Sequence, residues 1–213
     1  MIAFYLHGFA SGPQSTKAAY FADRLAEHGI AFRCPDFNQP DFASLTLTRM
    51  IDRLAAETAK TDDRITLIGS SLGGTLAILA AARPLPRIDR VILLAPAVMF
   101  AKPGHHLLPP ERIVEWRTRG ALPFFHYAYD DERLLGYEFY EDSLRYDAFG
   151  ARVPQPTLIF QGLRDASVDH RTVEAFARTR PNVTLSLLDD DHQLIASLSR
   201  IWDGVSDFMG LHE

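Results

Sequence analysis

Short apolar runs alternate along this chain with longer segments in which apolar residues recur every three or four positions. A short apolar run bounded by turn residues is typical of a buried strand, and the longer spacing is typical of an amphipathic helix. The runs predict six strands, over residues 2–6, 31–34, 64–69, 90–96, 156–162 and 182–188. The helical spacing covers residues 15–29, 44–60, 71–83, 170–180 and 197–210.

Apolar strands separated by helices predict an α/β fold, in which a mainly parallel sheet is covered by helices on both faces. The boundary residues agree with this prediction. Ser15 can cap the first helix and Gly29 can end it, while Pro84 and Pro86 stop the third. We expect a single domain over residues 1–213.

One segment, residues 102–150, interrupts the alternation. It has many aromatic residues and no clear strand, and its pattern indicates two helices, over residues 109–120 and 139–149. An excursion of this length within a compact domain is usually a lid or a binding loop with structure of its own. We therefore expect a helical cap inserted into the domain.

Composition and charge narrow the range of functions. With 47% hydrophobic residues and a formal net charge of -5, the chain has the composition of a globular protein without a broad positive field. Nucleic acid and anionic membranes are therefore poor candidate partners.

No apolar stretch is long enough to predict a membrane span, and no secretion signal is recognisable. The single cysteine, Cys34, fits a reducing cytoplasm, where we expect the protein. The oligomeric state is not indicated.

The sequence GSSLG, residues 69–73, fits the pattern G-x-S-x-G with Ser71 at its centre. It stands where a predicted strand ends and a predicted helix begins, which is the context of a nucleophile elbow. The serine of such an elbow has a strained backbone that flanking glycines permit. The amide of Leu72 would then be one donor of an oxyanion hole. The alternative is an ordinary turn whose serine caps the helix.

The sequence HGFASG follows the first predicted strand. A tight turn here would present the amide of Phe9 to Ser71 as the second oxyanion donor. We expect His7 to be structural, hydrogen-bonded within its loop.

Candidate acid and base residues follow the fifth and sixth predicted strands. Asp165 stands a few residues past the fifth strand, where a carboxylate can orient a histidine ring, and Asp169 is the competitor that could instead cap the next helix. His192 follows the sixth strand. The chain order Ser71, Asp165, His192 is that of α/β hydrolases. The run 189–191 is a polar loop on this interpretation, because it converges on no second cluster that would suggest a metal site.

These motifs resemble those of the small bacterial α/β-hydrolase esterases of the YqiA/YcfP type. The likeness is carried by FYLHGFASGPQSTKA, IGSSLGG, APAV, RDASVDHRTVEAF, DDDHQL and DFMGLH, and it spans nearly the whole chain apart from the insertion. It implies Ser71, Asp165 and His192 as a catalytic triad, a six-stranded sheet in the chain order 2-1-3-4-5-6, and esterase activity on small acyl esters. Members of this type often have glycine before the histidine, where this chain has Asp191.

Apolar residues of the insertion are candidates for a substrate pocket above Ser71, although most of them should only pack the cap onto the sheet. They are Leu107, Leu108, Trp116, Phe124, Phe125, Tyr127, Tyr137, Phe139 and Tyr140. His126 stands alone and receives no role.

The function expected from the sequence is a serine carboxylesterase or thioesterase that uses no metal and no organic cofactor. Two alternatives keep the fold. One is an enzyme that cleaves another bond, such as a dienelactone or carbon–carbon bond, and the other is a non-catalytic ligand-binding protein.

Overall fold

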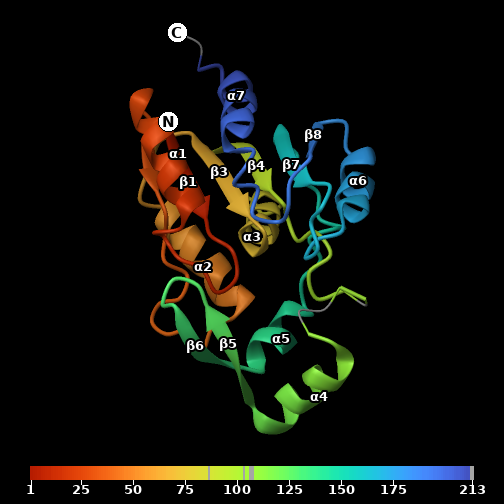
Figure 1. Cartoon of the computed structure of the whole chain (residues 1–213). Coiled ribbons are helices and arrows are strands. Elements are labelled where there is room, and N and C mark those ends of the chain that lie inside the picture. The colour runs from red at the N-terminus through yellow and green to blue at the C-terminus, as the bar shows by residue number, and fades with distance from the viewer. Residues whose placement is uncertain (86, 103, 106–107, 212–213) are drawn as a thin grey trace.

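A six-stranded sheet forms the centre of the computed structural model, which describes residues 1–85, 87–102, 104–105 and 108–211 (Figure 1). Its strands lie in the order β2-β1-β3-β4-β7-β8, and every neighbouring pair is parallel. The bounds are β1 Ile2–Leu6, β2 Ala31–Arg33, β3 Ile65–Ser70, β4 Ile88–Leu94, β7 Thr157–Gly162 and β8 Val183–Leu188. Each matches a predicted strand to within two residues, so the predicted six-stranded, mainly parallel sheet is confirmed. The last two strands are numbered seventh and eighth because the insertion contains two more.

Five helices cover the two faces of the sheet. Successive side chains of a strand point to opposite faces, so each strand contributes to the apolar core on both sides. In β1, the side chains of Phe4 and Leu6 enter the apolar core under α2, α3 and α6, whereas Tyr5 enters the core under α1 and α7. The bounds are α1 Thr16–Glu27, α2 Leu47–Thr58, α3 Leu72–Ala81, α6 His170–Arg178 and α7 Leu198–Met209. Helix α3 is buried along its whole length, which is why its sequence is almost entirely apolar.

The predicted ends of the first helix are confirmed. The Ser15 hydroxyl accepts a hydrogen bond from the amide of Ala18, and Gly29 follows the helix in the left-handed region with φ 65°. Helix α3 ends at Ala81, before Pro84, and Pro86 lies outside the described residues.

The insertion differs from its prediction. Its first predicted helix is confirmed as α4, Pro110–Arg119, and the second is the shorter α5, Glu138–Ser143. Between them an antiparallel hairpin is formed by β5, Ala121–His126, and β6, Asp131–Gly136, so the expectation of no strand was wrong.

Local sequence hides this hairpin because β5 contains Pro123 and β6 begins with three exposed charged residues, 131–133. Tertiary packing stabilises it, since Leu122 and Leu135 are buried in the same core as α2 and α3. Figure 1 shows the insertion at one end of the sheet, away from the C-terminal helix α7.

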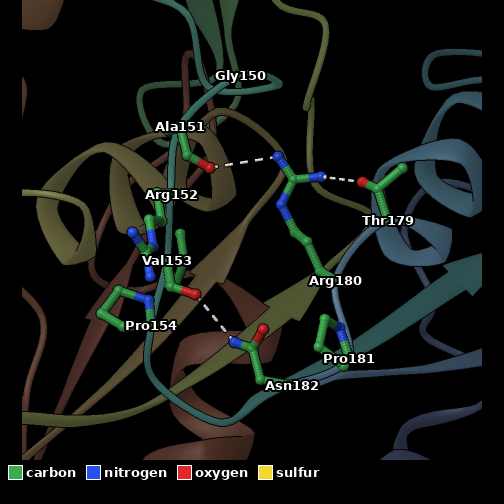
Figure 2. A pocket seen from close by; sticks show the side chains of 9 residues that line it. All are labelled: Gly150, Ala151, Arg152, Val153, Pro154, Thr179, Arg180, Pro181 and Asn182. Carbon is green, nitrogen blue, oxygen red and sulfur yellow. Dashed lines mark hydrogen bonds between the residues drawn. The ribbon is translucent and has the colours of Figure 1, made fainter.

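A surface pocket lies where β7 and β8 begin, at the amino ends of the strands. It is bordered by residues 150–154 and 179–182 (Figure 2). Arg180 donates to the carbonyl of Ala151 at 3.3 Å, and Asn182 donates to that of Val153 at 2.9 Å. These bonds join the two segments that enter the strands.

Within the described residues, no helix is both long and apolar enough to span a membrane.

Candidate active site

Ser71 lies in the turn between β3 and α3, with φ 53° and ψ -115°. This is the strained backbone expected of a serine at a nucleophile elbow. The elbow is fixed from β4, because the Ser71 amide donates to the carbonyl of Leu94 at 2.9 Å. Glycine is needed on both sides of Ser71 because other backbone segments approach the elbow closely. A Cβ on Gly69 would overlap the Gly73 carbonyl oxygen, and one on Gly73 would overlap that of Leu6.

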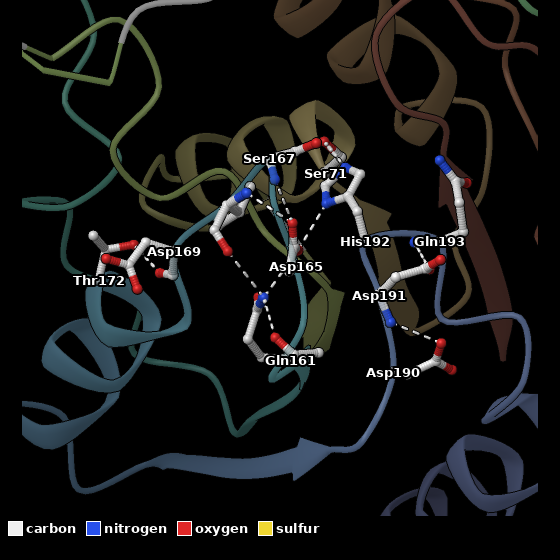
Figure 3. A network of polar contacts seen from close by, with 12 residues as sticks. Ser71, Gln161, Asp165, Ser167, Asp169, Thr172, Asp190, Asp191, His192 and Gln193 are labelled. Carbon is white, nitrogen blue, oxygen red and sulfur yellow. Dashed lines mark hydrogen bonds and ion pairs between the residues drawn. The ribbon is translucent and has the colours of Figure 1, made fainter.

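Three segments that are distant in sequence bring Ser71, His192 and Asp165 together (Figure 3). His192 Nε2 lies 3.0 Å from the Ser71 hydroxyl, and His192 Nδ1 lies 2.8 Å from Asp165 Oδ2. Because an ionised carboxylate only accepts, Nδ1 carries the proton and Nε2 is free to accept from the serine. In this arrangement the ring can take a proton from the hydroxyl.

Asp165 is held by donors on both of its oxygens. Oδ1 accepts from the amides of Ser167 and Val168, each at 2.8 Å, and Oδ2 accepts from Gln161 Nε2 at 2.9 Å as well as from His192. Burial on its own would raise the pKa of Asp165, but the hydrogen bonds from His192, Val168 and Gln161 hold it below its ordinary value. The carboxylate is therefore ionised at neutral pH.

The competitor Asp169 caps helix α6. Its Oδ1 accepts from the amide of Arg171 at 2.9 Å, and its backbone is extended as at an ordinary N-cap. Of the two candidate acids, Asp165 is the one that contacts His192.

The loop that carries His192 follows β8 and is bonded internally. Asp190 is 4% exposed, and its carboxylate accepts from the amides of Asp191 and Ser197. Asp191, in the place of the expected glycine, accepts from the amide of Gln193 at 2.8 Å. Among the described residues Asp191 is not one of those with positive φ, so this loop does not require a glycine there.

Two polar residues of this site were missed from the sequence. Gln161, fully buried in β7, bonds Asp165. Lys17 on α1 donates to the carbonyl of Gln193 at 2.8 Å, and burial lowers its pKa to about 8 although Asp191, Asp165 and Asp190 oppose the shift. The signals in the sequence were a glutamine inside an apolar strand and the lysine near the end of the motif FYLHGFASGPQSTKA.

Phe9 and Leu72 lie on the two segments that meet at Ser71. A Cβ on Gly8 would lie 3.5 Å from Ser71 Cβ, so the loop carrying Phe9 passes directly beside the serine. Leu72 is the first residue of α3, and its amide therefore has no acceptor within the helix. Both backbone segments therefore border Ser71.

His7 is structural, as expected. Its Nε2 accepts from the amide of Phe37 at 3.1 Å, and its Nδ1 lies 3.0 Å from the Gly8 carbonyl. Burial lowers the pKa of His7, so the neutral ring persists.

Aromatic rings of the insertion pack around Phe9. Its ring lies 5.4 Å from that of Phe124 and 5.5 Å from that of Phe139. Trp116 and Phe139 are buried, whereas Phe125 and Tyr127 are 48% and 72% exposed. The remaining described candidates are half-buried against the same core, namely Leu108, Tyr137 and Tyr140. Leu107 lies outside the described residues.

Among the described residues, no group of three or more His, Cys, Asp or Glu side chains could hold a metal ion.

Comparison with solved structures identifies the fold. Est1E from Butyrivibrio proteoclasticus, solved with ferulic acid, is similar with a TM-score of 0.82 and 24% identity, over 98% of this chain and 87% of that one. Mouse alpha/beta hydrolase domain-containing protein 10 has a TM-score of 0.78 and 21% identity, over 98% and 89%. A monoacylglycerol lipase from Paleococcus ferrophilus has 0.79 and 13%, over 99% and 94%. The fold is therefore that of the α/β hydrolases.

No curated protein matches the sequence significantly. A match to the uncharacterised protein family UPF0227 extends over residues 2–209, which is nearly the whole chain. The match includes every motif described above except the last three residues of DFMGLH. The chain therefore belongs to UPF0227, which confirms the resemblance to the YqiA/YcfP-type family.

Proposed function

We propose that this protein is a serine hydrolase, a carboxylesterase or thioesterase that cleaves small to medium acyl esters through Ser71, His192 and Asp165. One observation carries the proposal: His192 lies within hydrogen-bond distance of both the Ser71 hydroxyl and the Asp165 carboxylate. The esterase and lipase among the structures with this fold give further support. Its location would be the cytoplasm, in keeping with a single cysteine.

The reaction begins when the Ser71 oxygen attacks the carbonyl carbon of the ester and His192 Nε2 takes the hydroxyl proton. Asp165 stabilises the imidazolium that results. The amides of Phe9 and Leu72 bind the oxygen of the tetrahedral intermediate, and each such donor stabilises the transition state by roughly 2.7 to 4 kcal/mol.

Collapse of the intermediate breaks the bond to the alcohol or thiol, which leaves with the proton from His192. The acyl group then remains on Ser71. A water molecule gives a proton to His192 and attacks the carbonyl carbon of the acyl-enzyme. The bond to the Ser71 oxygen then breaks, this oxygen takes the proton from His192, and the acid is released.

Covalent labelling tests the proposal. A fluorophosphonate probe should label the wild-type protein, Ser71→Ala should not be labelled, and His192→Ala should be labelled much more slowly. Wild type should also hydrolyse short p-nitrophenyl esters. A folded wild-type protein that neither labels nor hydrolyses these esters would contradict the proposal and favour a non-catalytic protein. Labelling of Ser71 together with turnover of dienelactones, but of no simple ester, would favour the alternative enzyme that cleaves another bond.

The assignment of the acid has a matched pair of variants. Asp165→Asn should lower kcat by about 10³- to 10⁴-fold, because the amide cannot stabilise the imidazolium. Asp169→Asn should keep nearly full turnover, because asparagine caps a helix about as well as aspartate. The reverse ranking would move the acid to Asp169.

A further inference from the structure

The tip of the β5–β6 hairpin is bonded to the loop after β1, residues 7–12. The amide of Tyr127 donates to the carbonyl of Ala10 at 2.8 Å. A Cβ on Gly12 would lie 3.0 Å from that of Ala128, so the Gly12 backbone packs closely against the Ala128 side chain. The insertion thus reaches the segment that carries the Phe9 amide.

Asn38, in the loop after β2, forms a second link between the same two segments. It is 3% exposed, and its Nδ2 donates to the carbonyl of Ser11 at 2.8 Å. Since a carbonyl only accepts, the amide nitrogen of Asn38 must face Ser11, and its Oδ1 must face His126 at 3.2 Å. His126 Nε2 therefore carries a proton and donates it to this bond.

His126 has little freedom to adopt another geometry. It is fully buried, its ring stacks on Tyr129 at 4.2 Å, and it meets the ring of Phe42 edge to face at 4.7 Å. Burial lowers the pKa of His126, so the ring is neutral at pH 7. A fixed ring fixes the orientation of Asn38.

The loop that receives these bonds has a strained backbone beside the candidate oxyanion donor. Ala10 has φ 50°, in the left-handed region that alanine rarely adopts, and it directly follows Phe9. A strained conformation persists only where surrounding contacts hold it. The bonds to the carbonyls of Ala10 and Ser11 are such contacts.

We propose that Asn38 and His126 are positioning residues that hold the loop 7–12, and with it the Phe9 amide, in the geometry needed to bind an oxyanion. The inference rests on the proposed hydrolase function. It gives the insertion a part in catalysis beyond the lid or binding loop expected from the sequence, and it gives His126 a role that the sequence did not suggest.

The test compares variants that each remove or keep one hydrogen-bond donor of this link. Asn38→Asp keeps the shape and the acceptor for His126 but removes the donor to Ser11. His126→Leu removes the donor to Asn38, while His126→Gln keeps a donor at the place of Nε2. We expect Asn38→Asp and His126→Leu to lower kcat at least about tenfold with KM changed less than about threefold, because loss of a whole oxyanion donor lowers kcat by about 10²- to 10³-fold. His126→Gln should restore most of kcat.

Asn182→Asp is the matched control. Asn182 also donates its side-chain amide to backbone carbonyls, that of Val153 (Figure 2) and that of Gln155, but at the amino ends of the strands. It should lower the unfolding midpoint and leave kcat unchanged. Wild-type turnover is measured first, so that an inactive wild type counts against the proposed function alone.

Three results would overturn the inference in an active wild type. They are unchanged kcat in folded Asn38→Asp and His126→Leu, equal kcat in His126→Leu and His126→Gln, or an equal loss of kcat in Asn182→Asp. If Asn38→Asp does not fold, the two His126 variants decide by themselves.

Discussion

At the scale of single residues, Lys17 is a buried cation beside the loop that carries His192. Its side chain is 8% exposed and its Nζ donates to the carbonyl of Gln193. Desolvation lowers its pKa to about 8 from 10.5, against the attraction of Asp191, Asp165 and Asp190. The folded protein therefore holds this proton less tightly than the unfolded chain does.

This difference predicts how stability depends on pH. Between about pH 8 and pH 10.5 the unfolded chain binds more protons at Lys17 than the folded protein does, so this residue makes the free energy of unfolding rise with pH. Lys17→Met lacks that rise. The free energy of unfolding of wild type relative to Lys17→Met should increase by on the order of 2–3 kcal/mol between pH 7 and pH 10.

Urea unfolding of both proteins at several pH values measures this relative stability. Comparing the two proteins cancels the other groups that titrate in this range, such as Tyr5 and Cys34, whose pKa values burial raises. Parallel stability curves for wild type and Lys17→Met would show that Lys17 keeps its ordinary pKa.

At the scale of elements, the insertion is joined to the main domain through α5 and α2. Asp142 on α5 is 8% exposed and accepts from the amide and the hydroxyl of Thr48, at 2.7 and 2.6 Å. Thr48 is in the first turn of α2, where amides have no acceptor within the helix and a carboxylate is favoured by the helix dipole. This bond thus satisfies a free amide at the start of α2 and also anchors the insertion to the main domain.

Asp142→Asn should weaken this junction, since an amide group replaces one acceptor opposite two donors. We expect the free energy of unfolding to fall by about 1–3 kcal/mol. Amides of α5 and β6 should exchange hydrogen faster, while those of β3 and β4 keep their protection. Urea unfolding and hydrogen exchange measure the two effects, with the exposed neighbour variant Glu141→Gln as control. Unchanged exchange in the insertion would mean that the junction depends on apolar contacts alone.

At the scale of the whole molecule, the insertion and the sheet share one apolar core. Trp116 on α4 is fully buried in the cluster that includes Phe4 and Leu67 of the sheet, and its Nε1 donates to the carbonyl of Leu135 at 2.8 Å. Trp202 on α7 lies in the core of the opposite face. The two tryptophans therefore report on opposite layers of the molecule.

A shared core predicts that the chain unfolds as one cooperative unit. In Trp202→Phe, fluorescence reports on the insertion, and in Trp116→Phe it reports on the layer of α1 and α7. In each variant the urea midpoint by fluorescence should coincide with the midpoint by far-UV circular dichroism. An earlier fluorescence midpoint in Trp202→Phe alone would show that the insertion unfolds by itself.

The sequence was sufficient where the signal is local. Alternation of apolar and polar positions predicted the six strands and five helices of the main domain because burial of a face imposes its period on the chain. The glycines around Ser71 could be interpreted for the same reason, since a strained turn with close backbone approach excludes larger residues. The positions of Asp165 and His192 followed from the rule that functional groups gather at the carboxyl ends of parallel strands. Their catalytic role stays a prediction.

The hairpin β5–β6, the bond from Lys17 to Gln193 and the link from His126 through Asn38 to Ser11 were decided only by the tertiary structure. Pro123 and the charged start of β6 argue against strands locally, and burial of Leu122 and Leu135 against the main core outweighs them. The polar contacts join residues 27 to 176 positions apart. No periodic pattern encodes such pairs, because their geometry arises only when separate layers pack against one another.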